Sequence, residues 1–173
     1  MKEDFEQFKL QFKVLPLGLS INNLGCIRFD SNNNWNGQVG NYHGFVRFDK
    51  IENGIRAMTF ILMKYIYKYR LFDVRIILER YAPANDGNSP NIYARIVSQH
   101  AGIYFIPNKI AQLREVLPVL IYRMTCVENG KDYYIKSLQS KCFIDTFISC
   151  VQMYIDEYLN EVVYPVHGKK ETI

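Results

Sequence analysis

The sequence predicts a mainly α-helical (α+β) fold with a small β-hairpin near residues 25–50. Apolar side chains recur at helical spacing along most of the chain after residue 50. Between residues 22 and 49, by contrast, Asn, Gly and Ser separate short extended pieces. The 173 residues, 49% of them apolar and 22% charged, suffice for one buried core without a disulfide or a metal.

The first part of the chain is expected to hold a lead-in and the hairpin. Residues 1–20 are charged and aromatic, and Pro16 and Gly18 close this segment. Asn, Gly and Ser punctuate short extended pieces such as Cys26–Phe29 and Phe45–Phe48, which predicts a small β-hairpin or a three-strand ribbon.

Capping residues indicate where three helices begin. Asp49, with Glu52 three residues on, makes a capping-box pattern before a long helix that should be buried and central. Asp73 is the predicted cap of a second helix. Ser89 is the predicted cap of a third, with Pro90 at its first position.

Helix-breaking residues divide the rest of the chain. Gly102 should end the third helix. A fourth is expected over residues 108–128, bent or broken near Pro118, and Gly130 should stop it. A last long helix is expected over residues 132–163.

The cysteines predict reduced thiols and no zinc site. Cys26, Cys126, Cys142 and Cys150 form neither a CxxC pair nor a Cys/His cluster. Cys142 and Cys150 lie in an apolar helical pattern and are expected to be small core residues.

Several classes of protein have no support in the sequence. The three histidines form no HExxH pattern, and no P-loop, GxSxG or dinucleotide motif is present, so we expect no metal and no cofactor. The net charge of +4 is spread along the chain, which argues against a nucleic-acid partner. The amino terminus lacks the apolar core of a signal peptide, and no stretch is apolar enough to span a membrane.

Four stretches, in order, carry a resemblance to known proteins. They are Asn22–Phe29 with Trp35–Gln38, Gly44–Ala57, Ile76–Pro83 with Tyr93, and Val119–Gly130. Together they resemble the NNPGNIR…WxGQ…WAPP…ENG pattern of the small lysozyme-like or virion structural proteins of tailed bacteriophages. A more distant resemblance links the first stretch to the segment that follows the catalytic Glu in lysozyme-like glucosaminidases. Together the two resemblances suggest a permuted lysozyme-like fold.

The resemblance implies a domain organisation and a function. Residues 1–20 would be an N-terminal extension, 21–140 a lysozyme-like domain, and 141–173 a C-terminal helix and tail. The implied function is a phage-associated peptidoglycan glycosidase, of lysozyme or lytic-transglycosylase type. The alternative is a catalytically inactive virion structural protein that binds other virion proteins. Either would act in the virion or in the host cytoplasm.

Cleavage of a glycosidic bond needs a carboxylic acid that protonates the leaving oxygen, often with a second carboxylate as base or nucleophile. Glu128 is the predicted acid, because it follows the apolar stretch 116–127 and can face a cleft of low polarity. The alternative is a solvated residue in a last helical turn. Asp30, beside the hairpin, is the predicted second carboxylate, with Asp49 and Asp86 as competitors that fit a helix cap and a turn.

Four further residues are predicted to bind the substrate. Trp35, the single Trp, lies in a polar loop where its ring can stack on a sugar, or else covers the sheet. Asn23 and Tyr93 could hydrogen-bond to N-acetyl groups, or else serve local packing. Asp86 stands where the phage family tends to have Glu.

Overall fold

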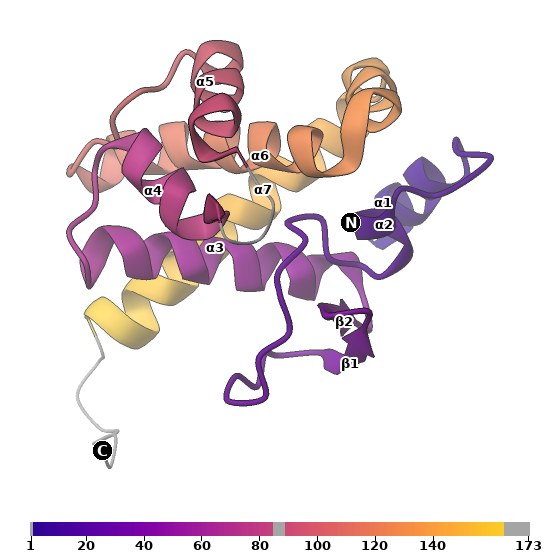
Figure 1. The fold of residues 1–173 in the computed structure, drawn as a ribbon, viewed down its shortest axis with the longest axis horizontal. Helices are drawn as coiled ribbons and strands as arrows, with labels where there is room; N and C mark the ends of the chain where they lie inside the picture. The colour runs from indigo at the N-terminus through magenta and orange to yellow at the C-terminus, as the bar shows by residue number, and fades with distance from the viewer. Residues whose placement is uncertain (1, 85–88, 165–173) are drawn as a thin grey trace.

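Helices form most of residues 2–84 and 89–164, the parts of the chain that the structure, a computed structural model, describes (Figure 1). In chain order these helices are α1 (Lys2–Lys9), α2 (Leu17–Ser20), α3 (Ile51–Tyr67), α4 (Val74–Tyr81), α5 (Pro90–Ala101), α6 (Ile110–Gln139), α7 (Lys141–Tyr158) and a π-helical turn, η2 (Leu159–Val163). The strands are β1 (Gln38–Tyr42) and β2 (Phe45–Phe48). The mainly α-helical class with one small hairpin is therefore confirmed.

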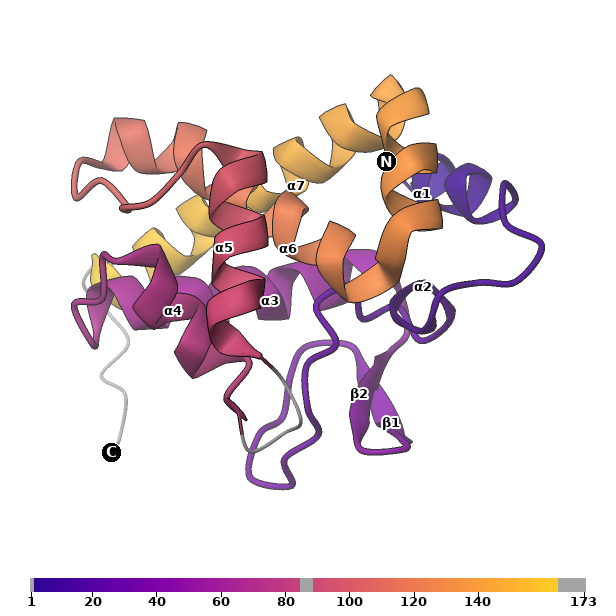
Figure 2. The same ribbon diagram turned by 45° about the horizontal axis from the view of Figure 1, so that its top comes forward.

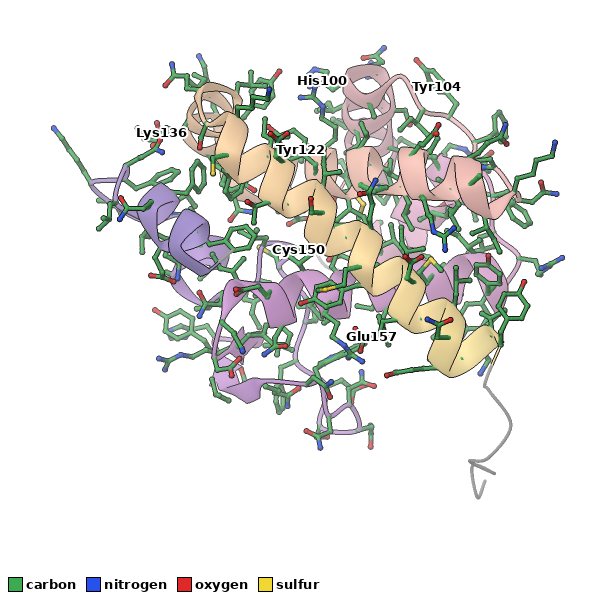
Figure 3. All side chains as sticks on the ribbon, turned by 180° about the vertical axis from the view of Figure 1, so that it is seen from behind. His100, Tyr104, Tyr122, Lys136, Cys150 and Glu157 are labelled. Atoms are coloured by element: carbon green, nitrogen blue, oxygen red, sulfur yellow. The ribbon has the colours of Figure 1, made fainter. Side chains whose placement is uncertain are left out.

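The long helices build the body of the molecule around α3. α7 packs against both α3 and α6, and Figure 3 shows it crossing the back of the molecule. α4 packs on α5, and α5 packs on α6. Figure 2 shows the hairpin at one edge, next to α2 and away from α5. The buried face of α3 includes Ile55, Leu62 and Ile66, as its apolar spacing predicts.

The hairpin joins β1 and β2 as antiparallel neighbours, with Tyr42 opposite Phe45. His43 and Gly44 both have positive φ, 49° and 87°, which suits a tight turn between strands. Residues 26–29 form no full strand but pair with β2 through one isolated bridge, Arg28 with Phe45. The Phe29 amide donates to the Gly44 carbonyl (2.8 Å) and the Val46 amide to the Ile27 carbonyl (3.0 Å). Cys26 has φ 48°, in the left-handed region, so the extended segment begins only after it.

Two of the predicted helix starts and one predicted end are confirmed. The side chain of Asp73 accepts hydrogen bonds from the amides of Arg75 (2.8 Å) and Ile76 (3.4 Å). Pro90 occupies the first turn of α5 after Ser89, whose side chain makes no capping bond. Gly102 ends α5 with φ 69°.

The capping role predicted for Asp49 is wrong. α3 begins at Ile51, with Lys50 as its N-cap and no side-chain capping bond. The Asp49 carboxylate instead accepts from the Asn53 side chain (2.7 Å), and its amide donates to the Gly37 carbonyl (2.9 Å). These bonds tie the hairpin loop to α3, so tertiary contacts replace the local cap.

Of the bend or break expected near Pro118, the break is wrong, since α6 continues through this residue. A proline removes the hydrogen bond to the carbonyl four residues earlier, here that of Arg114. The Gln152 side chain of α7 donates to that carbonyl (3.3 Å) and satisfies it. Non-helical backbone occurs instead at Gly130, with φ 82° and ψ −178°. Gly130 thus kinks α6, as predicted for the end of the fourth helix.

The last predicted helix, 132–163, is divided at Ser140. The hydroxyl of Ser140 accepts from the amide of Phe143 (3.3 Å) and caps α7. The residues before Ser140 belong to the second arm of α6. The residues predicted to form one helix therefore form two, separated by a cap at Ser140 that the sequence did not predict.

One apolar core joins residues from all three predicted parts of the chain. Phe5 and Phe8 of α1 are buried in the same core as the side chains of α3 and α7. The ring of Phe8 stacks on that of Phe143, with centroids 3.8 Å apart. The N-terminal lead-in is therefore part of the packing.

No disulfide joins the four cysteines, all of which lie in the described parts of the chain. Cys126 and Cys150 are buried, but Cys142 is exposed, so its prediction as a core residue is wrong. The core face of α7 is set by the neighbouring Phe143 and by Phe147, which turns Cys142 outward. Over residues 2–84 and 89–164, no helix is long and apolar enough to cross a membrane.

Candidate functional site

A buried asparagine shapes the loop that follows α2. Asn23 is fully buried, and its amide nitrogen donates to the carbonyls of Ile27 (3.0 Å) and Val46 (2.8 Å). Its side-chain oxygen accepts from the amide of Ile27 (2.9 Å). The amide group is thus used up by backbone bonds. These bonds match the local packing that was the alternative to substrate binding for Asn23.

Two longer-range bonds fix the same loop to the helices. The Asn129 side chain of α6 donates to the carbonyl of Leu24 (2.9 Å), and the Tyr81 hydroxyl of α4 donates to that of Gly25 (2.6 Å). A Cβ at Gly25 would overlap the Tyr81 hydroxyl and the Met58 sulfur, so any larger residue would force these side chains to shift. The loop is therefore held firmly where it presents Cys26.

Glu128 lies in the turn of α6 just before the kink at Gly130, and it is partly buried. Burial raises the pKa of its carboxyl above the usual 4.5, because the charged form loses hydration. The Tyr93 hydroxyl and the Cys26 thiol, which face the carboxylate, and the positive charge of Arg28 partly offset this rise. The balance favours a carboxyl that keeps its proton to a higher pH than an exposed one.

Tyr93 of α5 contributes a buried hydroxyl next to Glu128. The side chain is only 8% exposed, and its hydroxyl makes no hydrogen bond within the usual limits of distance and angle. Burial, followed by the charge of Glu128, raises the Tyr93 pKa well above its usual value. The hydroxyl therefore stays protonated and remains available as a donor beside Glu128.

Cys26 presents a thiol and not a thiolate. Burial and the neighbouring Glu128 raise the pKa of Cys26 to about 12. A nucleophilic cysteine needs a depressed pKa, because the thiolate is the reactive form. Cys26 is thus a poor candidate for a nucleophile, and its role here is to donate toward Glu128.

A cavity of about 520 Å³ opens beside Cys26, between the loop after α2 and helices α3 and α4. Its lining is aromatic and basic, with one carboxylate: Cys26, Ile27, Arg28, Asp30, Asn33, Trp35, Ile61, Lys64, Tyr65, Tyr69, Arg80 and Tyr81. Glu128 does not line it. Its carboxyl adjoins the cavity across Cys26 and Arg28, both of which do.

The aromatic rings of the cavity differ in what they can offer a ligand. The Arg80 guanidinium lies over the rings of Tyr69 and Tyr65, with its carbon 4.2 and 5.3 Å from the two centroids. Trp35 is half-buried and lines the cavity, and its indole N–H is buried without a partner. Trp35 therefore lies where a sugar-binding ring was predicted, with a donor still unused.

Asp30, the predicted second carboxylate, is exposed and lines the same cavity. Its carboxylate accepts from the backbone amide and the side-chain amide of Asn32, both at 2.9 Å, and so shapes its own turn. The structure thus brings Asp30 and Trp35 to one cavity, while Glu128 and Tyr93 meet next to Cys26, which lines that cavity. Asp86 lies outside the described residues.

The sequence analysis missed three members of the site: Cys26, Arg28 and Tyr81. Their contacts to Glu128 and Gly25 join distant segments, and no local pattern marks such contacts. Among the described residues, no group of three or more His, Cys, Asp or Glu side chains could hold a metal ion.

Fold and site together define a mainly helical protein with a partly buried glutamic acid beside an aromatic, basic cavity. By sequence, the chain is 33% identical over 90 residues to Protein P5 of Pseudoalteromonas phage PM2. The matched stretch covers 52% of this chain and 54% of that protein, so the chain spans about half the length of its relative. No protein-family model matches the sequence.

Proposed function

We propose that this chain is a phage-associated peptidoglycan glycosidase, of lysozyme or lytic-transglycosylase type, with Glu128 as its general acid. The observation that carries the proposal is the partial burial of Glu128, which raises its pKa next to a cavity of about 520 Å³. A raised pKa keeps the proton on the acid at the pH where it must be donated. The similarity to a phage protein supports a phage context.

The residues around Glu128 suit proton donation to a glycosidic oxygen. The Tyr93 hydroxyl and the Cys26 thiol face the carboxyl and can stabilise the carboxylate left once its proton has gone. Asp30, on the cavity lining, would serve as base or nucleophile. A transglycosylase would need Glu128 alone, because the sugar's own groups complete the displacement.

The cavity suits a sugar polymer that carries negative charge. Its volume falls within the range of about 300–1,000 Å³ common for ligand sites. Trp35 lines the cavity and offers a ring face to a sugar. Arg28 and Lys64 line the same cavity and would attract the carboxylates of a cell-wall polymer.

The alternative is a virion structural protein that binds other virion proteins and has no catalytic role. One observation favours it: Glu128 does not itself line the cavity where a glycan would bind. In the virion or in the host cytoplasm, the same cavity would then receive a protein segment.

Replacement of Glu128 decides between the two functions. Glu128→Gln keeps shape and hydrogen bonding but removes the transferable proton. Release of muropeptides from purified host cell walls should fall by about a hundredfold to ten-thousandfold. Glu115→Gln, an exposed carboxyl on the same helix, is the matched control and should keep full activity. Trp35→Ala should weaken binding of the cell-wall substrate.

Other outcomes of this assay are equally informative. If the unaltered protein releases no muropeptides from walls of its natural host, the enzyme proposal fails and the structural alternative takes its place. If it releases them and Glu128→Gln is fully active, the acid lies elsewhere, and Asp30→Asn is the next variant to measure.

A further inference from the structure

A second cavity, of about 320 Å³, lies between α5 and α6 and shares no lining residue with the first. Aliphatic side chains from both helices form its walls, among them Ile96, Val97 and Val127. Three basic side chains also line it: His100, Arg123 and Lys131. None of its lining residues is acidic. The cavity therefore combines apolar walls with basic side chains and has no acidic one.

Arg123 carries a charge that lacks a counter-ion in the described parts of the chain. Its Nε and Nη1 atoms are buried and have no hydrogen-bond partner. The guanidinium carbon lies 5.4 Å from the ring centroids of both Tyr122 and Tyr134. Aromatic rings attract a cation but accept few of its hydrogen bonds, and a guanidinium cannot lose its proton to escape the cost. A bound anion would therefore supply the hydrogen-bond acceptors and the negative charge that Arg123 lacks.

The kink of α6 and the end of α5 shape the mouth of this cavity. A Cβ at Gly130 would meet no atom within 4 Å, so open space adjoins the kink. Lys131 follows directly after it and lines the cavity. The His100 ring lies 6.2 Å from that of Tyr134, and Figure 3 shows His100 on α5. Donors from two helices therefore surround the space.

We propose that this cavity binds an anion with an apolar body: a carboxylate attached to an aliphatic group. The carboxylate would lie between Arg123 and Lys131, and the aliphatic part would rest on the walls from α5 and α6. Two sources carry this chemistry, a small aliphatic acid and the carboxyl terminus of a polypeptide that ends in an aliphatic residue. The proposal does not depend on the glycosidase function.

Binding of 4-methylpentanoate to the full chain, measured by calorimetry, tests the site. Its neutral isostere, 4-methylpentanamide, should bind at least about tenfold more weakly, because it lacks the charge-assisted hydrogen bonds. Arg123→Met should weaken binding of the acid by a similar factor. Arg95→Met, an exposed arginine on α5 outside the cavity, is the matched control and should leave it unchanged. Equal binding of acid and amide, or normal binding by Arg123→Met, would overturn the proposal.

A second measurement applies if Arg123→Met does not fold. Lys131 is exposed, so Lys131→Met should fold, and it should weaken binding of the acid severalfold. In the unaltered protein, 4-methylpentanoate should shift the amide NMR signals of residues 96–100 and 123–134. Shifts confined to the cavity beside Cys26 would contradict the site, as would unchanged affinity in Lys131→Met.

Two further probes define the ligand. N-acetyl-glycyl-leucine and its C-terminal amide separate the two sources: tighter binding of the peptide acid than of 4-methylpentanoate supports a polypeptide terminus, and weaker binding supports a small acid. Inorganic phosphate should bind more weakly than 4-methylpentanoate, because it gains nothing from the aliphatic walls. Phosphate binding of equal strength would overturn the apolar part of the proposal.

Discussion

Burial controls the chemistry of the side chains that meet at Glu128. Loss of hydration raises the pKa of all three neighbours, Glu128, Cys26 and Tyr93, so each favours its protonated form. Protonated groups donate, and in this cluster the thiol and the hydroxyl both face one carboxyl. Glu128 therefore keeps its proton to a higher pH than an exposed carboxyl. Once it is charged, its carboxylate still faces two hydrogen-bond donors.

The raised pKa of Glu128 predicts how stability depends on pH. Between the usual 4.5 and the higher folded-state pKa, the folded protein binds more protons than the unfolded chain. The free energy of unfolding therefore falls as pH rises through this window. Glu128→Gln has no such proton to lose, so its free energy of unfolding should fall less over this window. The difference in stability between the variant and the unaltered protein should therefore shift in favour of the variant toward neutral pH.

Urea unfolding in buffers from below pH 4.5 to neutral checks this expectation. Glu115→Gln, exposed on the same helix, should follow the unaltered protein throughout. Parallel pH profiles for Glu128→Gln and the unaltered protein would show that the Glu128 pKa is not raised in the folded state.

At the scale of elements, a kinked helix and a clamped loop bring the site together. The kink at Gly130 ends the first arm of α6 right after Glu128 and Asn129. Asn129 then holds Leu24, and the loop that follows presents Cys26 to the carboxyl. The contact between α3 and this loop is equally close, since a Cβ at Gly54 would overlap the carbonyl oxygen of Asn22.

The close approach at Gly54 predicts an inverted effect of alanine. Within a helix, Gly→Ala ordinarily stabilises by up to about 1 kcal/mol. At Gly54 the added methyl would also lie 3.3 Å from the Asn23 Cα, and backbone atoms cannot move aside cheaply. Gly54→Ala should therefore destabilise the protein by about 1–3 kcal/mol in urea unfolding. A gain in stability would mean that the loop after α2 can move away from α3.

Gln112→Ala, at an exposed position of α6, controls for the effect of alanine itself. It should change the free energy of unfolding by no more than about 0.5 kcal/mol.

At the scale of the whole molecule, one core runs from the first helix to the last long one. Phe5 and Phe8 are buried against α7, and the edge of Phe8 also meets Tyr133 in the second arm of α6, with centroids 5.7 Å apart. The N-terminal helix thus covers the place where the kinked arm of α6 returns to α7. Ion pairs add a second link across the core, with Arg56 of α3 joined to Glu157 of α7 at 2.7 Å.

This packing predicts that the N-terminal segment matters for stability. Phe8→Ala should destabilise the protein by about 3–5 kcal/mol, because a stacked, fully buried ring is lost. Leu10→Ala, two residues on and 76% exposed, should change stability by less than about 0.5 kcal/mol. Thermal or urea unfolding of both variants measures the difference. Equal effects of the two would show that α1 does not pack on α7 in solution.

Patterns of a few residues sufficed to predict most elements of the fold. The spacing of apolar residues located α3 and α7, Asp73 and Gly102 marked helix ends, and the Asn- and Gly-rich stretch located the hairpin. Each of these features depends on residues within one or two helical turns of it. The partners are therefore close in sequence, and a local pattern is enough to predict the feature. The same reasoning identified Glu128 as the residue just before a helix break.

Partners distant in sequence decided the rest, and only the tertiary structure shows them. Gln152 lets α6 continue through Pro118, and the amide of Asn23 is used up by backbone groups from the loop and the hairpin. The pKa of Glu128 likewise depends on its burial and on the facing Cys26 and Tyr93, which come from other segments. A carboxyl's acidity is set by the water and dipoles around it, and these are assembled by the fold, not by its position in the chain.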